Sequence, residues 1–323
     1  MIELYVASVL FSFVATFVFT KVLIPRLSRA AITGKDENKP GMPDIPEMGG
    51  IAIVAGFSAG MLGAIFFHSF LGFQLNLVFV MASIITIMSV GFIGIVDDLL
   101  SIPQWLKAIL PLFAAVPLMA VNAAGSTTIT IPFIGIVDFG IVYIFVLLPL
   151  AIAVCSNLTN MLAGFNGMEA GMGLIMFLAL SILAIAHGSV EMAVISVSMA
   201  AALLAFLAFN IYPAKIFIGD TGTFTIGVAL ATSVILGNLE TAGIILVIPY
   251  IIDFFIKAKN GFPHTHQEIR GGKLYPKDGK VKGLVHLVMK AFNGISERNL
   301  FMFFIIFEAL FALIALAIFF FRA

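Results

Sequence analysis

Ten apolar stretches, each close to the length of a membrane-spanning helix, constrain the fold of this chain most. They lie near residues 2–24, 49–67, 75–96, 104–123, 138–155, 168–186, 190–208, 221–237, 241–257 and 299–321. A helix needs about 20 apolar residues to cross the roughly 30 Å hydrocarbon core of a bilayer. Of the 323 residues, 61% are hydrophobic and only 11% are charged. We therefore predict one polytopic, all-α integral membrane domain over residues 1–323, with about ten transmembrane helices.

Charge and cysteine content narrow the functional classes. The formal net charge is zero, so the summed charge does not favour a nucleic-acid partner. The single cysteine, Cys155, lies in an apolar stretch without metal-ligand spacing around it, and we expect it to pack against other helices. The first apolar run has no basic segment before it, so we expect a retained span rather than a cleaved signal.

Basic residues fall on one side of the predicted spans. The loops near residues 68–74, 187–189 and 238–240 carry no lysine or arginine, and the loop at 124–137 alternates like a small external β-hairpin. The other loops and span ends hold every basic residue except Arg322. By the positive-inside rule, we predict that this face is cytoplasmic, that both termini are external and that the protein lies in the plasma membrane.

Five polar segments lie at the ends of the predicted spans, all on the inferred cytoplasmic face. They are residues 35–47, the pair Asp97 and Asp98, the segment with Asn157, Asn160 and Asn166, residues 219–222, and residues 264–270. Polar groups at membrane depth cost several kcal/mol unless they are paired, hydrated or functional. These segments therefore form the candidate site.

Three aspartates lead the candidate residues. Asp97 and Asp98 face the negative end of a helix dipole, which favours a nearby cation, although a solvated helix end would also explain them. Asp220 lies at a helix start, where it either caps the helix or marks an anion site. Asp220 and Asn160 offer the oxygen ligands that Mg²⁺ prefers. Lys107 is placed either to bind a phosphate or to extend its ammonium to the membrane surface.

Other ionisable residues carry weaker signals. His264 and His266 form an i, i+2 pair without cysteine partners, so a basic segment that reaches over an anionic substrate explains them better than zinc does. Asp253 and Glu308 are intramembrane acids and hence candidates for function. Asp253 lies one turn from Lys257 and can simply pair with it.

The ordered motifs of the chain resemble those of the polyprenyl-phosphate N-acetylhexosamine-1-phosphate transferases. They are GKDENK at 34–39, IPEMGG at 45–50, the Asp97–Asp98 pair with Lys107, NLTNMLAGFNGMEAG at 157–171 and FIGDTG at 217–222. The resemblance covers the whole chain and is closest to the branch that loads dolichyl phosphate with N-acetylglucosamine 1-phosphate and so primes N-glycosylation. The chain departs from that branch in its last basic loop, where it reads PHTH rather than PRHR.

The resemblance implies ten transmembrane helices, a cytoplasmic active site, a homodimer, and dependence on Mg²⁺, for which Mn²⁺ can substitute. The implied reaction transfers a sugar 1-phosphate from a UDP-sugar to a polyprenyl phosphate, releases UMP and leaves a membrane-bound lipid-linked sugar. Phosphoryl transfer of this kind relies on positioning and on charge neutralisation.

The resemblance also implies roles for individual residues. Asp220 and Asn160 would bind Mg²⁺, and Lys107 would hold phosphate oxygens. Asp97 would accept a proton from the lipid phosphate or orient it, and Asp98 would help to place substrate or metal. The other substrate-binding candidates are Glu47, Lys39, Asn157, Asn166, Phe217, His264, His266 and Arg270. Among these, Phe217 is expected to stack on uracil and Asn166 to contact the nucleotide.

Several alternatives stay open. Direct transfer and a covalent aspartyl-phosphate route are both chemically reasonable. The substrates could instead be another UDP-N-acetylhexosamine or undecaprenyl phosphate. A secondary transporter could use the aspartates as cation or proton sites, but it would place its binding groups near the bilayer midplane on interrupted helices. A transferase also needs an apolar groove for its lipid, and the sequence does not locate one.

Overall fold

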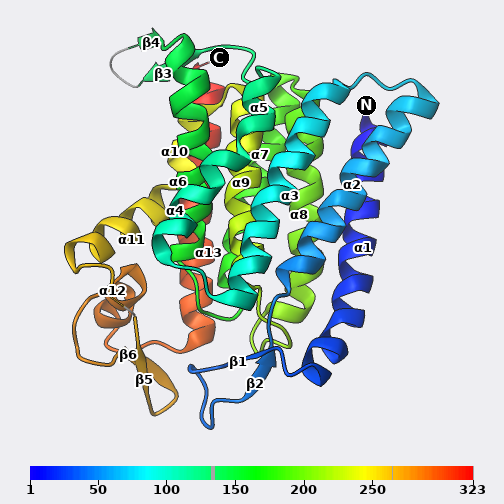
Figure 1. Cartoon of the computed structure of the whole chain (residues 1–323). Helices are drawn as coiled ribbons and strands as arrows, with labels where there is room; N and C mark the ends of the chain where they lie inside the picture. Colours follow the sequence, from blue (N-terminus) through cyan, green and yellow to red (C-terminus); the bar gives the residue numbers. More distant parts are fainter. Residues whose placement is uncertain (132–134, 264, 323) are drawn as a thin grey trace.

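The computed structural model is a bundle of long helices with three small hairpins, and it describes residues 1–131, 135–263 and 265–322 (Figure 1). Eight helices in the described residues are long and apolar enough to cross a membrane. They are α1 (Ile2–Arg29), α2 (Gly50–Leu71), α3 (Leu77–Leu100), η1 (Tyr143–Leu147) continued by α6 (Leu148–Met161), α7 (Met168–His187), α8 (Val190–Asn210), α9 (Gly219–Gly237) and α13 (Glu297–Arg322). The predicted multi-pass, mostly helical membrane fold is confirmed.

The two remaining apolar stretches are interrupted. α10 (Glu240–Leu246) and α11 (Ile248–Lys259) are bent by 57° relative to each other and together form a ninth candidate span. α4 (Gln104–Ala114) and α5 (Val116–Ala120) form a shorter apolar segment. Pro117 lies in the first turn of α5, where its missing N–H interrupts the helix. The stretch predicted at 104–123 is therefore shorter than a regular span.

The hairpins mark the two ends of the bundle. β3 (Thr128–Ile131) pairs antiparallel with β4 (Gly135–Asp138), which confirms the hairpin predicted at 124–137. β1 (Thr33–Lys35) pairs with β2 (Asp44–Pro46), and β5 (Gln267–Arg270) pairs with β6 (Lys273–Pro276) before the short helix α12 (Leu284–Ala291). Figure 1 shows both chain ends at the same end of the bundle as β3 and β4, whereas β1, β2, β5 and β6 lie at the opposite end. We call this opposite end the loop face.

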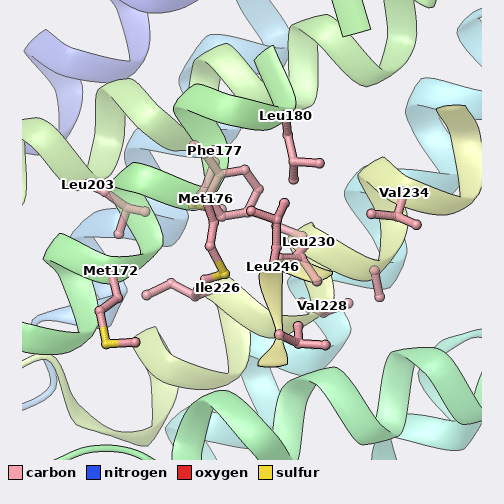
Figure 2. Packing of buried hydrophobic residues seen from close by; sticks show 14 of the residues in the cluster. Met172, Met176, Phe177, Leu180, Leu203, Ile226, Val228, Leu230, Val234 and Leu246 are labelled. Carbon is pink, nitrogen blue, oxygen red and sulfur yellow. The ribbon is translucent and has the colours of Figure 1, made fainter. Parts of the chain in front are cut away.

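The centre of the bundle holds the helix whose first turn carries Asp220. α9 is buried around nearly its whole circumference and is the most buried of the candidate spans, as expected for a helix surrounded by others. Its side chains Ile226 and Leu230 pack near Met176 and Phe177 of α7 (Figure 2). Cys155 of α6 packs against the same core, as predicted. This packing holds α9 so that its first turn, with Asp220, lies at the loop face.

Candidate functional site

The first turn of α9 is fixed by a side chain from α3. Asp98 accepts hydrogen bonds from the backbone N–H groups of Asp220 at 2.7 Å and Thr221 at 3.0 Å, and from the Thr221 hydroxyl at 2.6 Å. A helix leaves such N–H groups unpaired at its N-terminus. Asp98 therefore caps α9 from a neighbouring helix. Gly219 has a φ of +69°, and a Cβ there would lie 2.8 Å from the Asp98 carboxylate, so glycine is required.

The glycine-rich start of α2 holds the same turn from another side. The N–H groups of Gly49 and Gly50 donate to the carbonyl oxygens of Phe217 at 2.8 Å and Ile218 at 2.7 Å. A Cβ on Gly50 would overlap the backbone of Gly222. The IPEMGG and FIGDTG motifs, distant in sequence, therefore form one packed unit.

Lys107 lies between two aspartates. Its ammonium forms a buried ion pair with Asp97 and a second pair with Asp220 at 3.1 Å. The other Asp97 oxygen accepts a hydrogen bond from the N–H of Ile102 at 3.0 Å. Asn160 lies beside Asp220, because the Thr223 hydroxyl is 2.9 Å from the Asn160 side-chain oxygen and 3.1 Å from the Asp220 carbonyl oxygen. The structure thus gathers four predicted site residues, which we call the charged cluster: Asp97, Lys107, Asn160 and Asp220.

The asparagines at the end of α6 join this cluster to α4 and α9. Asn157 donates from Nδ2 to the carbonyl oxygens of Lys107 at 3.2 Å and Ala153 at 2.8 Å. Asn160 accepts at Oδ1 from the Thr223 hydroxyl at 2.9 Å. Asn157 therefore holds the backbone that carries Lys107, and Asn160 is held by α9.

Carboxylates outnumber cations in this region. Asp97 and Asp220 share the Lys107 ammonium, whereas Asp98 has only hydrogen-bond donors of the α9 start as described partners. Glu47 lies near Asp98 and Asp220. Burial, followed by the charges of Asp98 and Asp220, raises the pKa of the Glu47 carboxyl above its usual value. No group of three or more His, Cys, Asp or Glu in the described ranges is arranged to hold a metal by itself. The excess charge and the oxygen donors of Asp220 and Asn160 nevertheless fit Mg²⁺, which commonly takes one or two protein ligands and completes its shell with substrate and water.

A polar cavity of about 380 Å³ lies beside the charged cluster on the loop face. Its walls come from the β1–β2 region, the α6–α7 loop, the first turn of α9 and the segment that leads into β5. Predicted site residues line it: Glu47, Asn160, Asn166, Phe217 and Asp220. The volume lies within the range of small-molecule binding sites.

A larger cavity of about 940 Å³, lined mostly by apolar side chains, lies between α4, α6 and α11. Leu150, Val154 and Phe255 line it and are themselves exposed, so the cavity reaches the outer surface of the bundle. Lys107 and Asn157 lie at its polar end. We call it the apolar groove. It is the kind of groove that a lipid substrate needs, and composition alone did not locate it.

The polar cavity and the apolar groove meet at the charged cluster. Asn160 and Thr265 line both spaces. Lys107 lines the groove and pairs with Asp220, which lines the polar cavity. A polar ligand and an apolar ligand can therefore approach the same few side chains from different directions.

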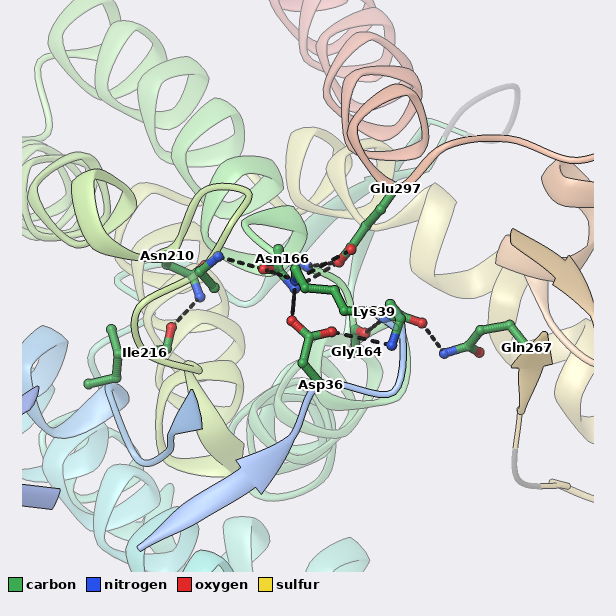
Figure 3. A network of polar contacts seen from close by, with 10 residues as sticks. Asp36, Lys39, Gly164, Asn166, Asn210, Ile216, Gln267 and Glu297 are labelled. Carbon is green, nitrogen blue, oxygen red and sulfur yellow. Dashed lines mark hydrogen bonds and ion pairs between the residues drawn. The ribbon is translucent and has the colours of Figure 1, made fainter. Parts of the chain in front are cut away.

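Asn166 and Lys39 belong to a buried network (Figure 3). Asn166 accepts at Oδ1 from Lys39 Nζ at 2.9 Å and from the N–H of Ala214 at 2.6 Å. It donates from Nδ2 to Glu297 at 2.7 Å and to Asp36 at 3.3 Å. Sequence reasoning missed Asp36 and Glu297. An acidic residue in the first turn of the last span was the available signal for Glu297.

The basic segment after α11 contributes less to the polar cavity than predicted. His264 lies outside the described residues. Of the described part of the segment, Thr265 and Gln267 line the polar cavity, whereas His266 and Arg270 do not. Arg270 is exposed and pairs within β5. Substrate contacts by His264, His266 and Arg270 stay predictions.

The intramembrane acids are placed differently from the charged cluster. Asp253 pairs with Lys257 at 2.9 Å and accepts from the N–H of Leu284 at 2.7 Å, so it joins α11 to α12. This confirms the structural interpretation of Asp253. Glu308 is fully buried in α13 and lines neither the polar cavity nor the apolar groove.

The chain is similar in sequence to several known proteins. A Sulfolobus acidocaldarius protein, provisionally named UDP-N-acetylglucosamine–dolichyl-phosphate N-acetylglucosaminephosphotransferase, is 38% identical over 315 residues, which are 95% of this chain and 94% of the relative. The Dictyostelium discoideum protein named for the same activity is 29% identical, over 94% of this chain and 86% of its own. A phospho-N-acetylmuramoyl-pentapeptide-transferase of Halalkalibacterium halodurans is 31% identical, over 82% of this chain and 89% of its own. Residues 79–238 match the glycosyl transferase family 4. The chain belongs to glycosyl transferase family 4.

Proposed function

We propose that this protein transfers N-acetylglucosamine 1-phosphate from UDP-N-acetylglucosamine to a polyprenyl phosphate of the dolichyl type and releases UMP. The observation that carries the proposal is the meeting of the polar cavity and the apolar groove at the charged cluster. A reaction between a nucleotide sugar and a membrane lipid needs two spaces of opposite polarity that share a reacting centre.

The polar cavity suits the nucleotide sugar. Phe217 offers an aromatic face on which uracil can stack. Asp220 and Asn160 are the residues that would hold Mg²⁺, which when bound neutralises charge on the diphosphate and on the leaving UMP. Glu47, whose pKa burial raises, lies at the cavity wall, where it can accept or donate a hydrogen bond to the sugar.

The apolar groove suits the prenyl chain. Burial of apolar surface stabilises the bound lipid by roughly 25 cal/mol per Å². The groove ends at Lys107. Once the Lys107 ammonium separates from Asp220, it can bind the lipid phosphate. Asn157 keeps this lysine at the end of the groove through the hydrogen bond to its carbonyl oxygen.

The adjacent aspartates take different roles in this proposal. Asp98 uses both carboxylate oxygens on the first turn of α9, so we assign it to positioning Asp220. Asp97 is buried against Lys107, and we assign it to orienting that ammonium and to accepting any proton left on the lipid phosphate. Direct attack of the lipid phosphate needs no covalent enzyme intermediate and is the route that we propose.

Similarity favours the N-acetylglucosamine branch. The Sulfolobus acidocaldarius relative is named for UDP-N-acetylglucosamine and dolichyl phosphate, and it aligns over more of this chain than the muramoyl-pentapeptide relative does. The second candidate is the same transfer with another UDP-N-acetylhexosamine or with undecaprenyl phosphate. The transporter alternative receives less support, because the charged cluster lies at helix ends on the loop face rather than at mid-span.

The proposed function also implies how the protein is oriented in the membrane and how it assembles. Every basic residue except Arg322 belongs to the loops and span ends of the loop face, so we place this face in the cytoplasm of a plasma-membrane protein, with both termini outside. UDP-sugars and Mg²⁺ would then reach the polar cavity directly. From the resemblance to the family, we also propose that the protein forms a homodimer.

A substrate panel tests the proposal. Purified protein with Mg²⁺ is given UDP-N-acetylglucosamine, UDP-N-acetylgalactosamine or UDP-N-acetylmuramoyl-pentapeptide, each with dolichyl or undecaprenyl phosphate. We expect the highest kcat/KM for UDP-N-acetylglucosamine with dolichyl phosphate. Preference for another donor or lipid would replace the substrate assignment and keep the reaction, whereas no product from any pair would contradict the function itself.

A further inference from the structure

A buried network joins four chain segments behind one wall of the polar cavity (Figure 3). Asp36 and Lys39 come from the loop after β1, Asn166 from the loop before α7, and Glu297 from the first turn of α13. The fourth segment connects α8 to α9, and its Ala214 N–H donates a hydrogen bond to Asn166. Asp36 and Glu297 are 2% and 5% exposed, so water contributes little to their solvation.

The Asn166 amide has no hydrogen-bonding capacity left for a ligand. Its oxygen accepts two hydrogen bonds and its nitrogen donates two, which is the full capacity of this side chain. The Asn166 N–H also donates to Glu297 at 3.0 Å. Glu297 therefore fixes both the backbone and the amide orientation of Asn166.

The loop that carries Asn166 is held at neighbouring points as well. The N–H of Gly164 donates to Glu169 at 2.5 Å, and Asn38 donates to the Gly164 carbonyl oxygen at 3.0 Å. Gly164 and Asn166 both line the polar cavity, whereas Glu297 and Lys39 do not. Glu297 can therefore act on a ligand only through the wall that it holds.

The charges of the network make Glu297 the residue to change. Lys39 pairs with Asp36 and lies 3.6 Å from Glu297, so one ammonium serves two buried carboxylates. Removal of Lys39 would leave both carboxylates uncompensated, which is strongly destabilising. Removal of the Glu297 charge leaves the Lys39–Asp36 pair intact.

We propose that Glu297 is a positioning residue for the nucleotide sugar: through Asn166 and with Lys39, it sets the cavity wall formed by residues 164–166. In this arrangement the hydrogen bonds of the Lys39 and Asn166 side chains hold the wall, in place of the direct hydrogen bonds to substrate predicted for them. This inference rests on the proposed UDP-sugar site.

The test compares Glu297→Ala and Glu297→Gln with the unmodified protein. The control, Asp278→Asn, removes an exposed carboxylate that pairs only locally with Lys282 among the described contacts. We expect Glu297→Ala to raise the KM for UDP-N-acetylglucosamine about tenfold, as for loss of a charged hydrogen bond, with little change in kcat or in the KM for polyprenyl phosphate. Glu297→Gln keeps an acceptor for Asn166 and should raise the KM less. Asp278→Asn should match the unmodified protein.

Hydrogen exchange of the peptide over residues 162–168 gives a readout that does not depend on the reaction. Glu297→Ala should speed exchange there and leave exchange in the strands β3 and β4 unchanged. Unchanged exchange at 162–168, or an equal loss of affinity for both substrates, would overturn the inference. If the unmodified protein makes no product, the proposed function fails, and the exchange result alone decides whether Glu297 holds the wall.

Discussion

The two adjacent aspartates of α3 show how neighbouring residues of one type acquire different tasks. Asp98 faces the first turn of α9 and accepts three hydrogen bonds, whereas Asp97 faces Lys107. The sequence indicated that Asp97, Asp98 and Asp220 belong to one site. It could not assign their partners, because these depend on how α3 docks against α9.

A pair of substitutions separates positioning by Asp98 from chemistry. Asp98→Asn presents an amide NH₂ to backbone donors and leaves a buried group unsatisfied, which costs about 1–3 kcal/mol. Thr221→Val removes only one of the three hydrogen bonds and costs about 1 kcal/mol. We expect kcat and the thermal unfolding midpoint to fall together, in the order unmodified, Thr221→Val, Asp98→Asn.

Thermal unfolding in detergent and initial rates measure both quantities. An Asp98→Asn protein that is inactive yet as stable as the unmodified protein would instead indicate that Asp98 acts directly on substrate or metal.

Buried partners such as Glu297 and Asp36 were harder to predict, because a lone acidic residue near a span end is ordinarily solvated.

At the scale of elements, the site depends on close approach of α2 and α3 to the first turn of α9. A Cβ on Gly94 would lie 2.5 Å from the Cα of Thr221, whereas a Cβ on Gly91, one turn earlier, would lie 3.1 Å from side-chain atoms of Thr225 and Val54. The backbone of Thr221 cannot move away from an added Cβ as easily as the side chains of Thr225 and Val54 can. Small residues at helix contacts permit such approach in membrane proteins.

The matched pair Gly94→Ala and Gly91→Ala tests this packing. We expect Gly94→Ala to displace the start of α9, to cost about 1–3 kcal/mol of stability and to abolish most activity. Gly91→Ala should retain most activity and stability, because the side chains around it can adjust. Thermal unfolding and initial rates measure the effects, and equal losses in the two variants would contradict a specific role for the contact at Gly94.

Apolar length predicted most helices of the bundle but not their interruptions. The bend between α10 and α11 lies inside an apolar run, next to Pro249 in the first turn of α11, and hydropathy alone does not reveal a change of helix direction. The proline break before α5 was visible in sequence, yet apolarity on both sides outweighed it. These interruptions matter because α4 and α11 form the walls of the apolar groove.

At the scale of the whole molecule, the apolar groove and the polar cavity divide the two proposed substrates. The sequence predicted that a lipid groove must exist but not where, since residues that line a groove have the same composition as residues that face lipid. The polar cavity was more predictable, because five polar segments were predicted on one face of the bundle and residues from four of them line the cavity.

Filling the groove should impair only the lipid substrate. Val154→Trp and Leu150→Trp place bulk among groove-lining side chains, so we expect the KM for polyprenyl phosphate to rise about tenfold, equivalent to about 1.4 kcal/mol. The KM for UDP-N-acetylglucosamine should stay unchanged. Leu178→Trp, at an exposed site of α7 that does not line the groove, is the control. Steady-state kinetics that show no change for the lipid would place its site elsewhere.

The most direct measurement of the central claim follows the phosphate. UDP-N-acetylglucosamine labelled in the β-phosphate is incubated with polyprenyl phosphate, Mg²⁺ and purified protein, with Asp220→Ala and Asp97→Ala in parallel. We predict that the label moves into the lipid with the sugar, that UMP is released, and that both variants lose the transfer while remaining folded. Label that stays in the aqueous phase as UDP while sugar enters the lipid, or full activity in Asp220→Ala, would contradict the account.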